Sequence, residues 1–352
     1  MYLDWNATAP MSPTVRTVYL EALEAYWANP HSQHNAGRKA LVEVEKAREK
    51  IANMVGVLPK NVRFTSGATE SNSWLFTHYH NNRAGNVGAK ILGSSIEHPS
   101  VLDWLDDTVP VNSDGVIQLD VLEQQLHTGK YALLSVMAAN NETGVLQPIA
   151  EIHRLAQRYS VPFHCDASQV YNKIQSDISA DFITISSHKM GGPKGVGALV
   201  LQKEITPLLR GGSQERGTRA GTVNAPVIIA MAEAMVSATA MDDSKQRMFE
   251  QFLSERVSVQ FMGARVPRLP NTSLGLFSVP GDMIVMALDM AGIAVSTGAA
   301  CSSASSKDSA VLEAMGYQGK PVRFSWGHDT DIESAMHNIV RIIGELEQTC
   351  EW

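Results

Sequence analysis

The chain has 352 residues, 44% hydrophobic and 18% charged, a composition typical of a globular protein large enough for two domains. Its formal net charge of −7 argues against bulk attraction to nucleic acid. The first ten residues lack a basic region followed by an apolar core, and the apolar runs are too short to cross a bilayer. The three cysteines make neither a disulfide framework nor a four-ligand zinc site, so we expect no metal and a cytoplasmic location.

Helices and strands alternate along the first two thirds of the chain. Helical spacing predicts helices over 13–27, 40–55, 121–127 and 149–159, and a further helix follows S-G-A-T-E-S-N and runs through Tyr79. Short apolar runs predict strands over 62–65, 90–95, 131–138, 161–165 and 181–185. Such alternation indicates a mainly parallel sheet covered by helices.

The composition becomes charged and helical near residues 241–247, where we place a domain boundary. Strands are then predicted over 271–277, 293–296 and 322–325, with a last helix over 331–347. We therefore expect a large domain of residues 13–247. Residues 1–12 and 248–352 should form a smaller α/β domain.

The segment 186–199, S-S-H-K-M-G-G-P-K-G-V-G-A-L, carries the strongest chemical signal. Lys189 stands between a polar turn and a glycine-rich turn, shortly after the strand and turn that hold Asp166 and Gln169. A lysine amine can form a Schiff base with the aldehyde of pyridoxal phosphate, and a carboxylate can keep the pyridine nitrogen protonated. This pairing predicts amino-acid chemistry at a carbon centre rather than hydride or phosphoryl transfer.

A phosphate site is predicted at S-G-A-T-E-S, residues 66–71, between a strand and a helix. Free backbone N–H groups and the positive end of the helix favour an anion there, Gly67 allows a tight turn, and Thr69 adds a hydroxyl donor. The alternative is an ordinary capping box, in which a Ser or Thr is followed by Glu. The nearby candidate Schiff-base lysine favours the phosphate interpretation.

Two further segments follow predicted strands at their carboxyl ends, where parallel sheets bind ligands. His98 lies in I-E-H-P-S and can place its ring against the cofactor; the alternative is a surface or capping histidine. Asn141 lies in N-N-E-T-G, residues 140–144, and the alternative there is a plain turn.

Seven motifs together resemble the cysteine desulfurases, fold-type-I pyridoxal-phosphate enzymes of the class-V aminotransferase superfamily. They are F-T-S-G-A-T-E-S-N, I-E-H-P-S-V-L, N-N-E-T-G, H-C-D-A-S-Q, S-S-H-K-M-G-G-P-K-G, Q-E-R-G-T-R-A-G-T and S-T-G-A-A-C-S-S-A-S. The resemblance runs in order over nearly the whole chain and implies a large domain with a mainly parallel seven-stranded sheet between helices. The long C-S-S-A-S-S loop is similar to the branch that includes the housekeeping iron–sulfur and nitrogen-fixation enzymes.

The resemblance also implies a role for each matched residue. Lys189 would hold the cofactor aldehyde, Asp166 would pair with the pyridine nitrogen, and Gln169 would bond the phenolic oxygen. His98 would stack on the ring and move protons, while Asn141 and Arg323 would hold the substrate carboxylate. Without the resemblance, Arg323 would be read as half of a surface salt bridge. The phosphate would be bound in the S-G-A-T-E-S segment, residues 66–71, and just before Lys189, by Ala68, Thr69, Ser186 and His188. Thr222 of the partner subunit would complete this phosphate site.

Cys301 distinguishes among the reactions that this fold carries out. An isolated cysteine is most often an inert small hydrophobe. The Gly, Ala and Ser residues around Cys301 offer little apolar bulk, which predicts an exposed, mobile thiol. The resemblance implies conversion of L-cysteine to L-alanine with a persulfide on Cys301, whereas Cys165 on a core strand is predicted to be structural.

The implied partners are a second copy of the chain and a sulfur acceptor, either an iron–sulfur scaffold or a thio-modification enzyme. We expect no direct nucleic-acid or membrane partner. Only one predicted helix, 331–347, follows Arg323, and this tail is shorter than in many housekeeping members of the family, which puts docking of a scaffold protein in doubt. A selenocysteine lyase or transaminase of the same fold stays open, as does a degenerate fold that serves only as a binding platform.

Overall fold

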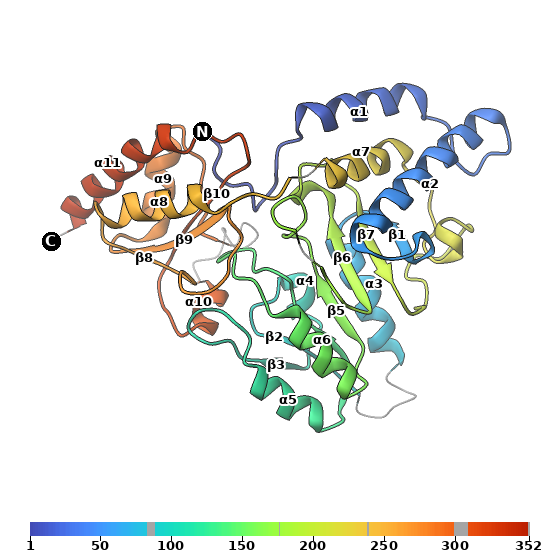
Figure 1. Ribbon diagram of the computed structural model, residues 1–352, viewed down its shortest axis with the longest axis horizontal. Coiled ribbons are helices and arrows are strands. Elements are labelled where there is room, and N and C mark those ends of the chain that lie inside the picture. The colour runs from blue at the N-terminus through green and yellow to red at the C-terminus, as the bar shows by residue number, and fades with distance from the viewer. Residues whose placement is uncertain (83–88, 176, 238, 299–308, 351–352) are drawn as a thin grey trace.

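The computed structural model describes residues 1–82, 89–175, 177–237, 239–298 and 309–350. Two sheets, each with its own helices, form two units joined side by side (Figure 1). This arrangement confirms the predicted α/β fold with a seven-stranded sheet and a smaller α/β unit.

The large sheet has the strand order β1-β7-β6-β5-β4-β2-β3. Its strands are β1 (Val62–Thr65), β2 (Lys90–Ser94), β3 (Asp107–Val109), β4 (Tyr131–Ser135), β5 (Phe163–Asp166), β6 (Phe182–Ser186) and β7 (Gly197–Leu201). Strands β2, β3, β4, β5 and β6 pair in parallel, whereas β7 runs antiparallel to both β1 and β6. The carboxyl ends of β1, β5 and β6 therefore lie at one edge of the sheet.

Helices cover both faces of this sheet, which explains why its central strands β5 and β6 are buried at every position. In β6, Phe182 packs in one cluster with Trp74 and Phe76 of α3, while Ile183 and Ile185 belong to the core on the other face. The helical segments of the large unit are α1 (Pro13–Ala25), α2 (Asn35–Val55), η1 (Pro59–Asn61), α3 (Ala68–Asn81), α4 (Pro99–Leu102), α5 (Leu119–His127), α6 (Ile149–Arg158), η3 (Ser187–Lys189), η4 (Glu215–Gly217) and α7 (Ala225–Val236).

The small sheet is antiparallel, with the order β10-β9-β8. Its elements are α8 (Ser244–Ser254), β8 (Val259–Phe261), β9 (Thr272–Phe277), α9 (Gly281–Met290), α10 (Ala310–Ala314), β10 (Val322–Ser325) and α11 (Glu333–Cys350). Phe249 and Leu253 of α8 belong to its core, so residue 247, the predicted boundary, falls within a helix of this unit. The division of the chain at 247 stays a prediction.

The first residues of the chain lie on the small unit before the chain crosses to α1 (Figure 1). The Leu3 N–H donates to Ala294 O at 2.8 Å, and the Ser325 N–H donates to Leu3 O at 2.8 Å. Leu3 is fully buried in the core of the small unit. Residues 2–6 therefore link the two units immediately before the large one begins.

One predicted strand is absent from both sheets. Residues 293–296 make only isolated bridges, Tyr2 with Ala294 and Ser296 with Arg323. These two bridges involve different partners and opposite directions, so no regular ladder forms. The prediction of a strand over 293–296 was wrong.

Candidate functional site

The site is built at the carboxyl edge of the large sheet. Asp166 ends β5 and pairs in register with Thr184 of the neighbouring β6. Ser186 ends β6, and the 3-10 turn η3 that follows it carries Lys189. Adjacent strand ends therefore bring the predicted carboxylate and the predicted amine to the same region.

Asp166 is a buried carboxylate held by two N–H donors. Its Oδ2 accepts from Asn72 Nδ2 at 3.0 Å, and its Oδ1 accepts from the Ser168 N–H at 3.0 Å. A buried carboxylate needs hydrogen bonds or a positive partner to remain charged. Asp166 is thus fixed in orientation and suited to a protonated ring nitrogen.

Lys189 is half-buried, and its amine is held at the junction of the two units. Its Nζ donates to the backbone oxygens of Asn6 at 2.6 Å and Ala7 at 2.9 Å. Both acceptors are neutral carbonyls from the segment that links the units. These two bonds fix the position of the amine at the junction of the two units.

Asn6 connects three of the predicted residues, Lys189, Gln169 and Asn141, although its sequence context did not single it out. Its backbone oxygen also accepts from Gln169 Nε2 at 3.1 Å. Its Nδ2 donates to Asn141 O at 3.3 Å and to Thr272 Oγ1 of the small sheet at 2.8 Å. Asn6 is 1% exposed, so these bonds are shielded from water.

His98 caps α4, as the capping alternative predicted, and this geometry fixes its tautomer. The Ser100 N–H donates to His98 Nδ1 at 3.1 Å. An N–H group can only donate, so Nδ1 carries no proton and the neutral ring has its proton on Nε2. Burial first, and the charge of Lys189 second, lower the pKa of His98, while Asp166 and Asp103 act in the opposite direction.

A chain of hydrogen bonds joins His98 to Asp166. Ser100 Oγ lies 2.9 Å from His98 Nδ1, and Asn72 Nδ2 donates to Ser100 Oγ and to Asp166 Oδ2, both at 3.0 Å. Asn72 stands in the S-G-A-T-E-S-N motif, but nothing in the spacing indicated this bridging position. His98, predicted to stack on the ring, is therefore linked through Ser100 and Asn72 to Asp166, predicted to bind the ring nitrogen.

The predicted phosphate residues gather around the start of β7. Gly197 pairs with Thr65 at the end of β1 and with Ser186 at the end of β6. A Cβ on Gly197 would lie 2.7 Å from Gly67 Cα, so only glycine allows this approach. Gly67 is the N-cap of α3 and offers no capping side chain to its first turn, where Ala68 and an exposed Thr69 lie. The capping alternative is present in part, because Glu70 Oε2 accepts from the Ser66 N–H at 2.7 Å.

His188 lies between this edge and the linking segment. Its Nδ1 is 3.2 Å from Thr8 Oγ1. Burial, followed by the charges of Lys189 and Lys194, lowers the pKa of His188 to about 4. The ring is therefore neutral at pH 7 in this state of the site.

Arg323 reaches the same region from β10 of the small sheet. Its Nη1 donates to Asn141 O at 2.8 Å, and its Nη2 donates to Asp4 Oδ1 at 2.6 Å. The side chain is 2% exposed, so the surface salt bridge alternative does not hold. Its Nε is buried and has no hydrogen-bond partner in the described parts of the chain. Each Nη keeps a second hydrogen for a further acceptor.

Cys301 lies outside the described residues, so its position is not part of the site geometry. The residues that flank 299–308 both lie against Glu142. Ser309 Oγ donates to Glu142 Oε2 at 2.6 Å, and a Cβ on Gly298 would lie 2.6 Å from the same oxygen. Burial raises the pKa of Glu142. Cys165 is fully buried on β5, as predicted for a structural cysteine.

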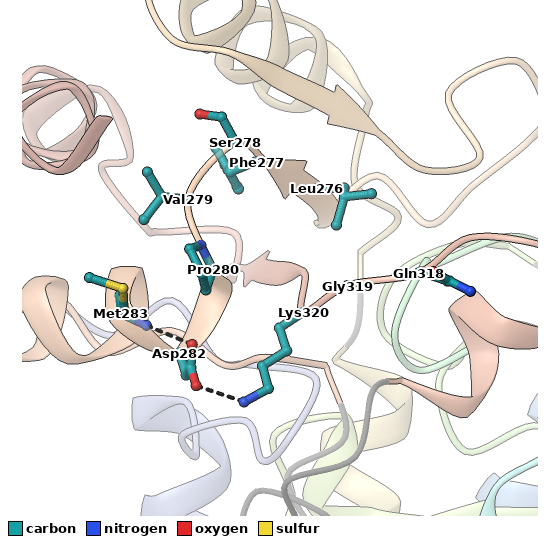
Figure 2. A pocket seen from close by; sticks show the side chains of 10 residues that line it. All are labelled: Leu276, Phe277, Ser278, Val279, Pro280, Asp282, Met283, Gln318, Gly319 and Lys320. Atoms are coloured by element: carbon teal, nitrogen blue, oxygen red, sulfur yellow. Dashed lines mark hydrogen bonds and ion pairs between the residues drawn. The ribbon is translucent and has the colours of Figure 1, made fainter. Parts of the chain in front are cut away.

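A separate hollow of about 670 Å³ lies on the small unit and contains none of the predicted site residues. Figure 2 shows it between the end of β9, the start of α9 and residues 318–320, with Lys320 Nζ bonded to Asp282 Oδ2 at 2.7 Å. Within the described ranges, no group of His, Cys, Asp or Glu is arranged to hold a metal. No helix in those ranges is long and apolar enough to cross a membrane.

Comparison with known proteins gives consistent matches over nearly the whole chain. The class-V aminotransferase family matches residues 1–335. A cysteine desulfurase IscS of Dictyoglomus turgidum is 37% identical, with 98% of this chain and 95% of that protein aligned. A mitochondrial cysteine desulfurase of Drosophila melanogaster is 36% identical over 100% of this chain and 82% of its own length.

Solved structures give the same result at the level of the fold. A NifS-like protein superimposes with a TM-score of 0.88 at 31% identity, covering 99% of both chains. SspA in complex with cysteine superimposes with a TM-score of 0.82 at 30% identity, covering 92% of this chain and 98% of its own.

Proposed function

Since the chain belongs to the cysteine desulfurases of the class-V aminotransferase family, we propose that it converts L-cysteine to L-alanine with pyridoxal phosphate and leaves the sulfur on Cys301. The main support is the convergence of a buried carboxylate and an amine from adjacent strand ends. Asp166 and Lys189 provide them, and Asn6 fixes the amine at the boundary between the units.

The donor set fits pyridoxal phosphate. When bound, this cofactor draws electrons from the bonds at the substrate Cα. Lys189 would hold its aldehyde carbon, and the Asp166 carboxylate, fixed by Asn72 and Ser168, would hold the ring nitrogen. Gln169 would bond the phenolic oxygen.

The phosphate of the cofactor is a dianion that needs N–H and O–H donors. The first turn of α3 supplies backbone N–H groups and the positive end of a 14-residue helix. Ala68 and Thr69 stand in that turn, and Ser186 at the end of β6 and His188 in η3 would add further donors. Neutral His188 can donate from one ring nitrogen, and a phosphate beside it would favour its protonated form.

Arg323 and Asn141 would bind the carboxylate of cysteine. Two Arg323 nitrogens keep hydrogens beyond their bonds to Asn141 O and Asp4, and a planar guanidinium suits a carboxylate better than an ammonium does. His98 would receive and return a proton through Nε2, because its Nδ1 is engaged by Ser100.

The sulfur step balances without an external oxidant. The Cys301 thiolate attacks the sulfur of the bound cysteine, the bond from that sulfur to Cβ breaks, and its electron pair stays on carbon, which takes up a proton. The products are L-alanine and one persulfide, which a thiol acceptor can then reduce or receive. The acceptor would be an iron–sulfur scaffold or a thio-modification enzyme, and we propose a cytoplasmic location.

We also propose a homodimer in which Thr222 completes the phosphate site of the partner subunit. Thr222 is exposed, as expected of a side chain that reaches another subunit. Leu20 and Leu23, three residues apart on one face of α1, are 56% and 45% exposed, and Trp27 just after the helix is 75% exposed. Exposed apolar faces of this kind are typical of subunit interfaces.

The proposal is tested with L-cysteine, pyridoxal phosphate and the purified protein. We expect equal amounts of alanine and transferable sulfur, together with one added sulfur on the Cys301 peptide that a reducing thiol removes. Cys301→Ser should still bind the cofactor and respond spectrally to cysteine, but form neither persulfide nor sulfide. Cys350→Ser is the matched control and should behave as the wild type. Near-normal alanine from Cys301→Ser would instead favour a lyase or transaminase.

A further inference from the structure

A second lysine is buried beside the predicted cofactor lysine. Lys173 is 4% exposed, and its Nζ donates to Gln169 Oε1 at 2.6 Å and to Asn6 Oδ1 at 2.9 Å. No carboxylate in the described parts of the chain pairs with it. Burial, and then the charges of Lys189 and Arg323, hold the pKa of Lys173 well below its usual value.

An unpaired buried amine is costly, so its retention calls for a reason. A neutral amine has two N–H groups and a charged one has three, so either form can serve both carboxamide oxygens. Lys173 can therefore keep these two bonds whatever its protonation state. Its two acceptors, Gln169 and Asn6, belong to the site around Lys189.

The two carboxamides depend on Lys173 to different degrees. Asn6 keeps its orientation without Lys173, because its Nδ2 donates to Asn141 O and Thr272 Oγ1. Among the described residues, the Gln169 carboxamide is bound by Lys173 at Oε1 and by Asn6 O at Nε2, at 2.6 and 3.1 Å. Gln169 is 5% exposed, so loss of Lys173 would leave a buried oxygen without a donor.

We propose that Lys173 is a positioning residue that anchors Gln169 so that its amide N–H group faces Lys189 and the phenolic oxygen of the cofactor. Gln169 Nε2 carries two hydrogens, and only one is needed for Asn6 O. The second is available to the ring oxygen as long as Oε1 stays bound to Lys173. This inference rests on the proposed function, because it concerns how the cofactor is held.

The test compares Lys173→Met, which keeps the length of the side chain and removes the donor, with Lys203→Met. Lys203 is the matched control, since its side chain is 53% exposed and pairs with Asp181, away from the predicted site residues. Each variant is loaded with pyridoxal phosphate, and its visible spectrum and rate of cofactor release are measured. A thermal unfolding curve of the cofactor-free protein gives the purely structural effect.

We expect Lys173→Met to bind the cofactor, to show an altered visible band at fixed pH, and to release the cofactor about fivefold faster or more, as for the net loss of one hydrogen bond. Gln169→Met should change the spectrum in the same direction. The double variant should add little to either single one, because Lys173 acts through Gln169. Lys203→Met should match the wild type.

Two results would overturn the inference. One is a Lys173→Met protein with the wild-type spectrum and release rate, even if its unfolding temperature changes. The other is full additivity of the Lys173 and Gln169 effects. Should Lys173→Met not fold, Lys173→Leu removes the same donor in a smaller side chain and is judged alike. A wild-type protein that takes up no cofactor would refute the proposed function itself. The two results that would overturn the role of Lys173 leave the proposed function intact.

Discussion

A buried ion pair anchors the glycine-rich loop that contains Thr222. Arg48 and Glu215 form two parallel bonds of 2.9 and 2.8 Å, and both side chains are 3% exposed. Glu215 Oε2 also accepts from the Phe64 N–H at 2.8 Å, and Arg48 Nη1 donates to Val62 O at 2.8 Å. The pair thus ties the loop to α2 and β1.

Replacing Glu215 by alanine should leave the Arg48 cation buried without its main partner. Breaking a buried pair on one side typically costs about 3–5 kcal/mol. At roughly 2.1 cal/mol/K per residue, a chain of this length has an unfolding entropy of about 0.7 kcal/mol/K, so Glu215→Ala should lower Tm by about 4–7 °C. The loop backbone should also rely on the ion pair, because Glu215 and Arg216 have φ values of 46° and 59°. Such left-handed values are unfavourable for residues other than glycine.

Glu45 provides a matched control, because it also pairs with Arg48, at 3.1 Å, but its side chain is 41% exposed. Glu45→Ala should cost no more than about 1 kcal/mol, as is usual for surface pairs. Unfolding of both variants is followed by circular dichroism without cofactor. The double variant Arg48→Met/Glu215→Leu should recover part of the loss, because it removes the unpaired charge but still takes the side-chain partners from the Phe64 N–H and Val62 O. Equal losses for Glu215→Ala and Glu45→Ala would refute this reasoning.

Two further predictions concern assembly and acid stability. Mixing Lys189→Ala with a Thr222→Ala variant under conditions that exchange subunits should restore some activity, because one site of the heterodimer has both residues; a fully active monomer in sedimentation would contradict it. Burial lowers the pKa of His164 to about 4, whereas a histidine in the unfolded chain has a pKa of about 6.5. Between pH 4 and pH 6.5 the unfolded chain therefore binds one more proton than the folded protein. Stability should therefore fall as pH drops from about 6.5 to 4, and His164→Gln should flatten this slope in urea unfolding; an unchanged slope would count against it.

The sequence predicted elements best where the hydrophobic pattern was local. Strand β10 was predicted over its observed range of Val322–Ser325, and the helices near α1, α2, α5 and α6 differ mainly at their ends. Helix α7 was not predicted, because it is apolar around most of its circumference and shows no helical period. Strand β7 was missed because its first residues belong to a glycine-rich motif.

The sequence predicted the motif residues of the candidate site, but not the hydrogen bonds that link them. Asp166 and Lys189 converge because Asp166 ends β5 and Lys189 lies in the turn that follows the neighbouring parallel strand β6, an arrangement that the order of elements already indicated. Asn6, Asn72 and Lys173 carry the hydrogen bonds between the motif residues. Their positions depend on the packing of segments distant in the sequence, which no local pattern records.

The pairing of residues 2–6 with the small unit has a consequence for synthesis of the chain. Leu3 and Trp5 bond Ser325, so their partner emerges from the ribosome about 320 residues later. At about 5–20 residues per second, that interval is roughly 16–64 s. During this time the large sheet can form while Asn6 still lacks Thr272 and Ser325, its contacts in the small unit. The amine of Lys189 therefore acquires its final surroundings only after residue 325 has been synthesised, and cofactor loading should follow the folding of the small unit.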